Sequence, residues 1–212
     1  MKADEIQWIT KNGADGLAFW QAYDPTVKVD LSCSALQVDG KILFIDPIPL
    51  AEAAIEELTS SGTPAAVVVT NANHERAAAW YARRFGIPVF APAETRPEFE
   101  ARIPTVQTFE NGSVILNTLK AIALPGGADG ETALYWPGLG GVLIVGDALI
   151  HLDATGFDFL PDKYCNDAKM LRKSAKERLR FPRGLRIIAF AHGAPMVTSA
   201  KERLEALIGA GE

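Results

Sequence analysis

Cysteine is scarce in this sequence, because Cys33 and Cys165 are the only two in 212 residues. They lie far apart and form no Cys-x-x-Cys pair, so we expect packed or free thiols, and neither a disulfide nor a zinc knuckle. A long apolar segment is also missing, since the most apolar neighbourhood, residues 134–150, contains a proline, four glycines and an aspartate. A membrane-spanning helix needs about 20 apolar residues, and the first residues lack the apolar segment of a signal peptide. The sequence therefore predicts a cytoplasmic protein without a membrane partner.

Positive charge is also in short supply, since the formal net charge is −5 at pH 7. Nucleic-acid binding needs a concentrated basic surface, so we do not expect this class of partner. One local exception is the basic segment at residues 169–186. Its first part has apolar residues at Met170, Leu171 and Leu179, which predicts an amphipathic helix. We expect the charges of this helix to form a solvated face. The eight basic residues of this segment are Lys169, Arg172, Lys173, Lys176, Arg178, Arg180, Arg183 and Arg186.

The first half of the chain predicts short strands, followed by helices that alternate with strands. Asp39-Gly40 is a strong β-hairpin signal, because both residues tolerate a positive φ angle. Residues 49–58 and about 75–85 have helical composition and spacing, and Gly86 is a stop signal for the second helix. We expect strands at residues 6–10, 17–23, 31–38, 42–45, 65–69 and 87–90.

The second half is again rich in strands and closes with helices. We expect helices in the basic segment and at residues 199–207, and a loop at residues 156–164. Strands interleaved with helices indicate a mixed α/β class, and the length and 48% hydrophobic content suit a single domain over residues 1–212. The expected strands are residues 105–109, 113–116, 119–124, 132–136, 141–145 and 185–191.

Two common catalytic signatures are absent from the sequence. The glycine-rich stretch 126–130 lacks the Gly-Lys-Ser/Thr ending of a phosphate-binding loop. There is also no Gly-x-Ser-x-Gly nucleophile elbow. Serine-nucleophile catalysis therefore has no motif to support it.

One heptapeptide resembles the metal-binding loop of the metallo-β-lactamase superfamily. Residues 70–76 read Thr-Asn-Ala-Asn-His-Glu-Arg directly after the apolar run 65–69, and the family carries Thr-His-x-His-x-Asp-His at such a strand end. Asn71, Asn73, Glu75 and Arg76 therefore stand where His, His, Asp and His are found in the family.

Further segments follow in the order of the same family. Asp46-Pro47 is similar to the strand end Leu-Ile-Asp-x-Gly, and residues 124–132 resemble the loop Pro-Gly-His-Thr-x-Gly, with Gly127 at a metal-ligand position. Asp147 follows a strand within a Gly-Asp element, where the family has a bridging carboxylate, and His192 begins the final His-Gly. The resemblance covers about residues 31–195, and it implies a four-layer αββα sandwich related to metal-dependent hydrolases.

The histidine count limits the metal chemistry that this resemblance implies. A two-zinc centre of the family draws on four or five histidines, whereas this chain has only His74, His151 and His192. Asparagine oxygens are weak zinc ligands, and a guanidinium brings a positive charge. We therefore expect no tightly bound cofactor, and at most one weakly held zinc. Arg76 is the cation that we expect to pair with Asp147 in place of a metal, because a guanidinium forks well onto a carboxylate.

Three functional hypotheses stay open at this point. The first is a non-catalytic or repurposed binding protein for an unknown small molecule, with Asn71, Asn73, Arg76, Gly127 and His192 in its cleft. The second is a hydrolase that uses one metal at Asp147 and His192, with His74 or Glu75 as a further ligand. The third is general acid-base chemistry by His74, Glu75 and Asp147.

His74 and its neighbourhood also have structural interpretations. His74 stands one position off the family's ligand register, so it is either a base or ligand, or a side chain that caps the next helix or pairs with a carboxylate. His151 and Asp153 follow the Gly-Asp element, and we expect them at the surface. Neither the substrate nor the oligomeric state can be assigned from the sequence.

Overall fold

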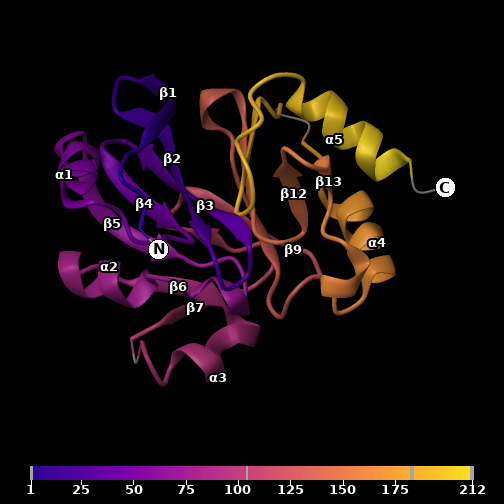
Figure 1. Cartoon of the computed structure of the whole chain (residues 1–212), viewed down its shortest axis with the longest axis horizontal. Coiled ribbons are helices and arrows are strands. Elements are labelled where there is room, and N and C mark those ends of the chain that lie inside the picture. The colour runs from indigo at the N-terminus through magenta and orange to yellow at the C-terminus, as the bar shows by residue number, and fades with distance from the viewer. Residues whose placement is uncertain (1, 104, 182–183, 211–212) are drawn as a thin grey trace.

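The protein is a layered mixture of helices and sheets (Figure 1). The computed structural model describes residues 2–103, 105–181 and 184–210. The first sheet has seven strands in sequence order, of which the first four are antiparallel and the last four, from β4 onward, are parallel to one another. These strands are β1 (Gln7–Asn12), β2 (Asp15–Asp24), β3 (Val29–Val38), β4 (Lys41–Ile45), β5 (Thr63–Val68), β6 (Val89–Pro92) and β7 (Gln107–Phe109).

The second sheet has five strands in the order β14-β11-β10-β9-β8. All of its neighbours are antiparallel except β11 and β14, which run parallel. Its strands are β8 (Val114–Ile115), β9 (Leu119–Ala123), β10 (Thr132–Trp136), β11 (Val142–Val145) and β14 (Ile187–Phe190). A separate hairpin joins β12 (Leu149–Leu152) to β13 (Gly156–Phe159).

Helices cover the outer faces of the two sheets. On the first sheet lie α1 (Glu52–Ser60) and α2 (Ala78–Phe85), and α4 (Ala168–Arg178) and α5 (Ala200–Gly209) lie on the second sheet (Figure 1). The short α3 (Arg96–Phe99) follows β6. Among the described residues, no helix is both long and apolar enough to cross a membrane.

Three hydrophobic clusters correspond to the three interfaces between these layers. The first packs Phe44 and Val67 of the first sheet against Tyr81 of α2. A second lies between the sheets and includes Leu36 from one and Leu134 from the other, and a third packs the second sheet against α4 and α5. The expected αββα sandwich is therefore confirmed.

Most of the predicted elements are present, and the exceptions have local causes. The Asp39-Gly40 turn joins β3 to β4, with φ angles of 50° and 73°. The helix expected from about residue 75 begins only at Ala78, because residues 72–74 form a 3-10 turn and Arg76 has a φ of 42°. Both cysteines are free thiols, as expected.

The prediction of a loop over residues 156–164 is wrong for its first part. Residues Gly156–Phe159 form β13, which pairs with β12 in antiparallel register. In the basic segment, the amphipathic helix is confirmed as α4, which buries Leu171. Met170 is exposed, however, because it directly precedes Leu171 and consecutive residues of a helix point in different directions.

Candidate metal centre

The candidate site lies where four strands end. Asp46 directly follows β4, and the segment that contains His74 follows β5, the parallel neighbour of β4. Asp147 and His192 come just after β11 and β14, which are parallel neighbours in the second sheet. Since the carboxyl ends of parallel strands meet at one edge of a sheet, each sheet delivers two polar side chains to the same place.

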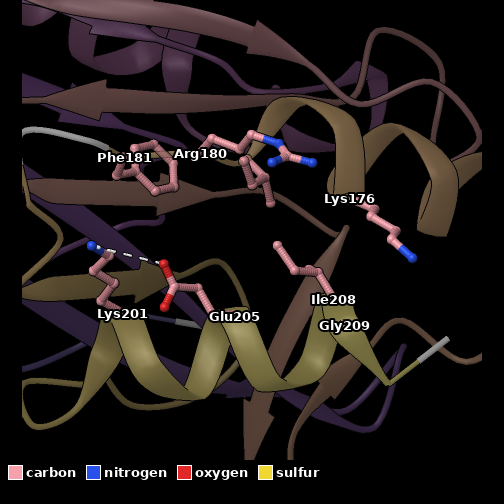
Figure 2. Close-up of a pocket in the computed structure, with 8 residues that line it drawn as sticks. Lys176, Arg180, Phe181, Lys201, Glu205, Ile208 and Gly209 are labelled. Carbon is pink, nitrogen blue, oxygen red and sulfur yellow. Dashed lines mark ion pairs between the residues drawn. The ribbon is translucent and has the colours of Figure 1, made fainter. Parts of the chain in front are cut away.

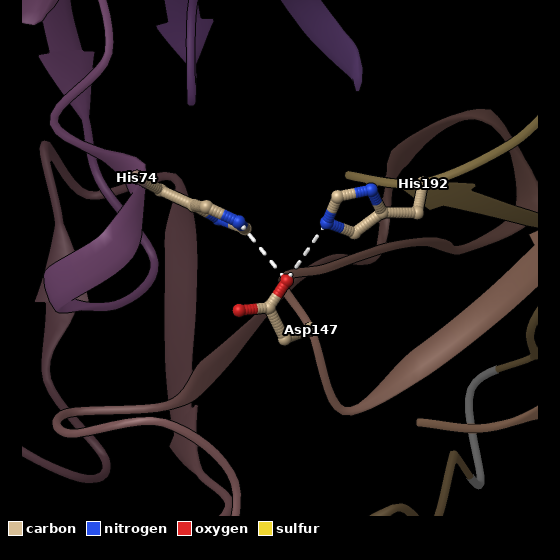
Figure 3. Close-up of side chains that lie close together, drawn as sticks. All are labelled: His74, Asp147 and His192. Atoms are coloured by element: carbon tan, nitrogen blue, oxygen red, sulfur yellow. Dashed lines mark hydrogen bonds and ion pairs between the residues drawn. The ribbon is translucent and has the colours of Figure 1, made fainter. Parts of the chain in front are cut away.

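His74, Asp147 and His192 form a compact group at this edge (Figure 3). The Nε2 atom of His74 lies 3.1 Å from Oδ1 of Asp147, and Nε2 of His192 lies 3.0 Å from the same oxygen. One ligand atom from each residue lies within 4.8 Å of the other two. His74 and Asp147 are buried, and the His192 side chain is 16% exposed. Solvent therefore reaches the group mainly beside His192.

His74 is held from behind by Asp46 and Thr70. Its Nδ1 atom lies 2.9 Å from Oδ2 of Asp46 and 3.0 Å from Oγ1 of Thr70. The Thr70 hydroxyl donates to that same Asp46 oxygen at 2.6 Å, and the Thr70 backbone N–H donates to the other at 2.8 Å. Because the imidazole is bonded on both nitrogens, its orientation is fixed.

The charges around His74 decide its protonation. Burial and the nearby Arg76 guanidinium lower the pKa of His74, but the carboxylates of Asp147 and Asp46 outweigh them and raise it to about 9. Burial also opposes the charged form of Asp147, yet His74 and His192 hold the pKa of this carboxyl well below its usual range. At neutral pH, His74 is therefore an imidazolium that lies between the carboxylates of Asp46 and Asp147.

Two asparagines occupy the second side of Asp147. The Nδ2 atoms of Asn71 and Asn73 donate to Oδ2 of Asp147 at 3.2 and 3.4 Å. The Asn71 side-chain oxygen accepts from the Asn73 backbone N–H at 2.9 Å, which fixes the direction of the amide. These amides therefore meet Asp147 with donor hydrogens, and not with oxygens that could bind a cation.

Glu131 is a member of the site that the sequence analysis missed. Its Oε2 accepts from Nδ2 of Asn71 at 2.8 Å, and its Oε1 accepts from the Ala148 backbone N–H at 3.0 Å. Burial and the charge of Asp147 raise the pKa of Glu131 to about 8. A lone glutamate in a glycine-rich loop carries no local signal of this role.

Gly127 explains how Glu131 fits into the site. A β-carbon on Gly127 would lie 2.7 Å from Cγ and 2.9 Å from Cβ of Glu131. The glutamate therefore fills the space that a larger residue at position 127 would need. The missing side chain at position 127 and the buried carboxyl group of Glu131 therefore fit together in one space.

The expected ion pair between Arg76 and Asp147 is wrong. The Arg76 guanidinium donates to three backbone carbonyl oxygens, those of Ser32 at 2.7 Å, Asp46 at 3.1 Å and Ala191 at 3.4 Å. Asp147 is already surrounded by histidine and amide donors, so it needs no guanidinium. Arg76 instead connects β3 and the end of β4 in the first sheet with the end of β14 in the second.

The remaining candidates lie outside the group of three. Glu75 points to Arg102, whose guanidinium nitrogen is 2.9 Å from its Oε2. A ring nitrogen of His151, on β12, lies 2.8 Å from the carbonyl oxygen of Ala194. Asp153 is exposed, in agreement with its expected surface position.

The side chains around Asp147 suit one divalent cation and not two. A second cation beside Asp147 does not fit, because donor hydrogens of Asn71 and Asn73 face the oxygen that it would use. A single divalent cation does fit, since His74, Asp147 and His192 supply two nitrogens and one carboxylate. Asp46 behind His74 is the kind of carboxylate that orients a metal-bound histidine. Binding would require His74 to release the proton on Nε2.

The chain is similar to known proteins of one superfamily. A family model described as Metallo-beta-lactamase superfamily matches residues 12–209. A search of the curated proteins found no match. Among solved structures, the DIM-1 metallo-beta-lactamase is similar with a TM-score of 0.70 and 12% identity, over 99% of this chain and 100% of that chain.

Two further structures show the same likeness. A metallo-beta-lactamase from Pontibacter korlensis has a TM-score of 0.70 and 17% identity, over 97% of this chain and 99% of its own. The metallo-beta-lactamase FIM-1 from Pseudomonas aeruginosa, in its mono-zinc form, has a TM-score of 0.67 and 13% identity, over 97% of this chain and 96% of its own. At these identities the similarity concerns the fold.

Proposed function

The chain belongs to the metallo-β-lactamase superfamily, and on that premise we propose that it is a hydrolase that uses one divalent cation, most simply zinc. The observation that supports this function is the convergence of His74, Asp147 and His192, with Asp46 behind His74. A mono-zinc form is known for the similar FIM-1 enzyme. One cation site of this kind is therefore compatible with the fold.

Some residues of the site would hold the cation, and others orient the residues that hold it. A bound divalent cation supplies Lewis acidity and lowers the pKa of water. Asp46 and Thr70 fix the direction of His74, so its Nε2 faces Asp147. Asn71 and Asn73 hold the second oxygen of Asp147, which leaves the first oxygen to face both histidines. His192, the most exposed of the three, borders the approach for substrate.

Zinc titration of the metal-free protein tests this function. We expect calorimetry at pH 8 to show one site, which His192→Ala removes and His151→Ala leaves intact because His151 lies outside the group. Zinc-dependent hydrolysis of ester, thioester or phosphoester probes should follow the same pattern. Failure of the wild-type protein to bind zinc, or binding that survives His192→Ala, would overturn the proposal.

A second candidate function is a metal-free binding protein. It is favoured by the four donors that already surround Asp147, from His74, His192, Asn71 and Asn73. The His74 imidazolium then takes the place of a metal charge. ¹⁵N chemical shifts of His74 distinguish the two functions, because a doubly protonated ring that persists at pH 8 under excess zinc supports the metal-free alternative.

A further inference from the structure

A second place of interest is a cavity of about 560 Å³ between α4 and α5. Figure 2 shows α5 along one side of it and the end of α4 with the residues that follow along the other. None of the residues that line it belongs to the candidate metal centre. Its volume lies within the range of about 300–1,000 Å³ that is usual for small-molecule sites.

The cavity has an apolar floor. Leu179 and Phe181 line it from the α4 side, and they are only 2% and 7% exposed. From α5, the side chain of Ile208 points into the gap (Figure 2). A ligand with a hydrocarbon part would find its apolar contacts mainly at Ile208, with the small exposed parts of Leu179 and Phe181 beneath it.

The rim of the cavity is basic. Lys176 lies in the last turn of α4, Arg180 follows two residues after the helix ends, and Lys201 projects from α5. Glu205 is the one acidic lining residue, and it lies 3.8 Å from Lys201 as an i,i+4 pair. Within the described part of the chain, no side chain pairs with the Arg180 guanidinium. Arg180 and Lys201, with Glu205 as the one carboxylate, leave the rim with a net positive charge in a chain of net charge −5, which indicates an anionic occupant.

We propose that this cavity binds a single-chain fatty carboxylate as a free, monomeric ligand. Its carboxylate would lie at the rim near Arg180 and Lys201, because a guanidinium binds a carboxylate in a two-pronged manner. Its acyl chain would cover Leu179, Phe181 and Ile208. The basic segment of the sequence thus serves a binding site, and not only a solvated helix face.

Calorimetry with dodecanoate, below its micelle-forming concentration, tests this proposal on the full-length protein. We expect one binding site per chain, and at least a tenfold weaker Kd in the double variant Arg180→Glu/Lys201→Glu. The matched control is Lys173→Glu, an exposed reversal on α4 outside the cavity, which should leave the Kd unchanged. If the double variant does not fold, Arg180→Glu alone gives the same comparison.

Three further probes test separately the charge of the ligand, its hydrocarbon chain and its source. Acetate carries the charge without a chain, dodecanol carries the chain without a charge, and both should bind at least tenfold more weakly than dodecanoate. Vesicles that contain anionic phospholipid test the membrane as an alternative source of the headgroup. The proposal would be overturned if dodecanoate does not bind, or if the protein binds only to vesicles. It would also be overturned if acetate or dodecanol binds as tightly as dodecanoate, or if the double variant keeps the Kd of the wild type.

Discussion

His74 and Asp147 lie 3.1 Å apart between Nε2 and Oδ1, although they come from different sheets. On its other side, His74 contacts Asp46 at 2.9 Å, so a positive ring stands between two buried carboxylates. A metal that binds at His74 must replace a proton there. The acid-base state of His74 therefore links folding, metal binding and the proposed hydrolysis.

The first prediction concerns metal content. We expect the protein to hold less than one tightly bound zinc per chain after purification and dialysis, because a zinc at the single site must displace the proton of His74, and donor hydrogens of Asn71 and Asn73 close the second position at Asp147. Elemental analysis against protein concentration measures this. Two equivalents of zinc that survive dialysis would contradict the geometry described above.

The second prediction is a loss of stability as pH rises in the metal-free protein. The folded-state pKa of His74, about 9, lies above its usual value of 6.5, so its stabilising contribution is complete below pH 6.5 and disappears as pH rises through 9. Glu131, raised from 4.5 to about 8, acts in the same direction. Urea unfolding with a chelator present should show a lower midpoint at pH 9 than at pH 6.5.

The size of this effect is on the order of 3 kcal/mol for His74 if its pKa alone determines it. The control is His74→Gln, in which the contribution of this residue to the pH dependence is absent. A wild-type midpoint that rises between pH 6.5 and 9 would contradict the assignment of a buried imidazolium.

The third prediction concerns Asp46. Asp46→Asn keeps the shape of the side chain but removes one of the two carboxylates that face His74, so the pKa of His74 should fall, as NMR titration can show. Removing one partner of a buried ion pair costs about 3–5 kcal/mol. We expect a loss near the lower end of that range in urea unfolding, because the amide can still bond to Thr70. Asp39→Asn, in the exposed hairpin turn, is the matched control.

The fourth prediction concerns Arg76. Arg76→Ala removes a charged donor from three carbonyl oxygens, and each charge-assisted hydrogen bond contributes about 1.5–3 kcal/mol. We expect a total loss of about 2–4 kcal/mol, since water can reach part of the space. The pKa of His74 should rise further, because the guanidinium lowers it. Arg83→Ala, on an exposed part of α2, should change neither quantity; a stable Arg76→Ala with an unchanged His74 pKa would show that the arginine points to solvent.

The fifth prediction concerns the pair Gly127 and Glu131. Gly127→Ala places a β-carbon 2.7 Å from Cγ of Glu131, and an overpacked core typically loses about 1–3 kcal/mol. Glu131→Ala should reduce the cost of Gly127→Ala, so the double variant is more stable than the sum of the two single effects predicts. Additive effects in urea unfolding would show that the two positions do not share space.

Local sequence patterns were sufficient for much of the fold. The alternation of apolar residues, the Asp39-Gly40 turn and the stop at Gly86 depend on neighbours in the chain, and the structure contains the elements that they predicted. The loop predicted at residues 156–159 is instead strand β13, because this strand forms through its pairing with β12. The single-domain organisation remains a prediction.

The sequence by itself determined which polar residues follow the strands, and the order of those residues placed Asp147 and His192 at one edge. The tertiary structure alone decided the partners at that edge. Asp46 and His74 are 28 positions apart, Asn71 and Glu131 are 60 apart, and Arg76 reaches a carbonyl 115 positions away. Periodicity reports only which face of an element is buried. Which donor meets which acceptor depends on how two sheets pack, so the buried imidazolium, the glutamate in the space beside Gly127 and the arginine on backbone oxygens followed only from the folded chain.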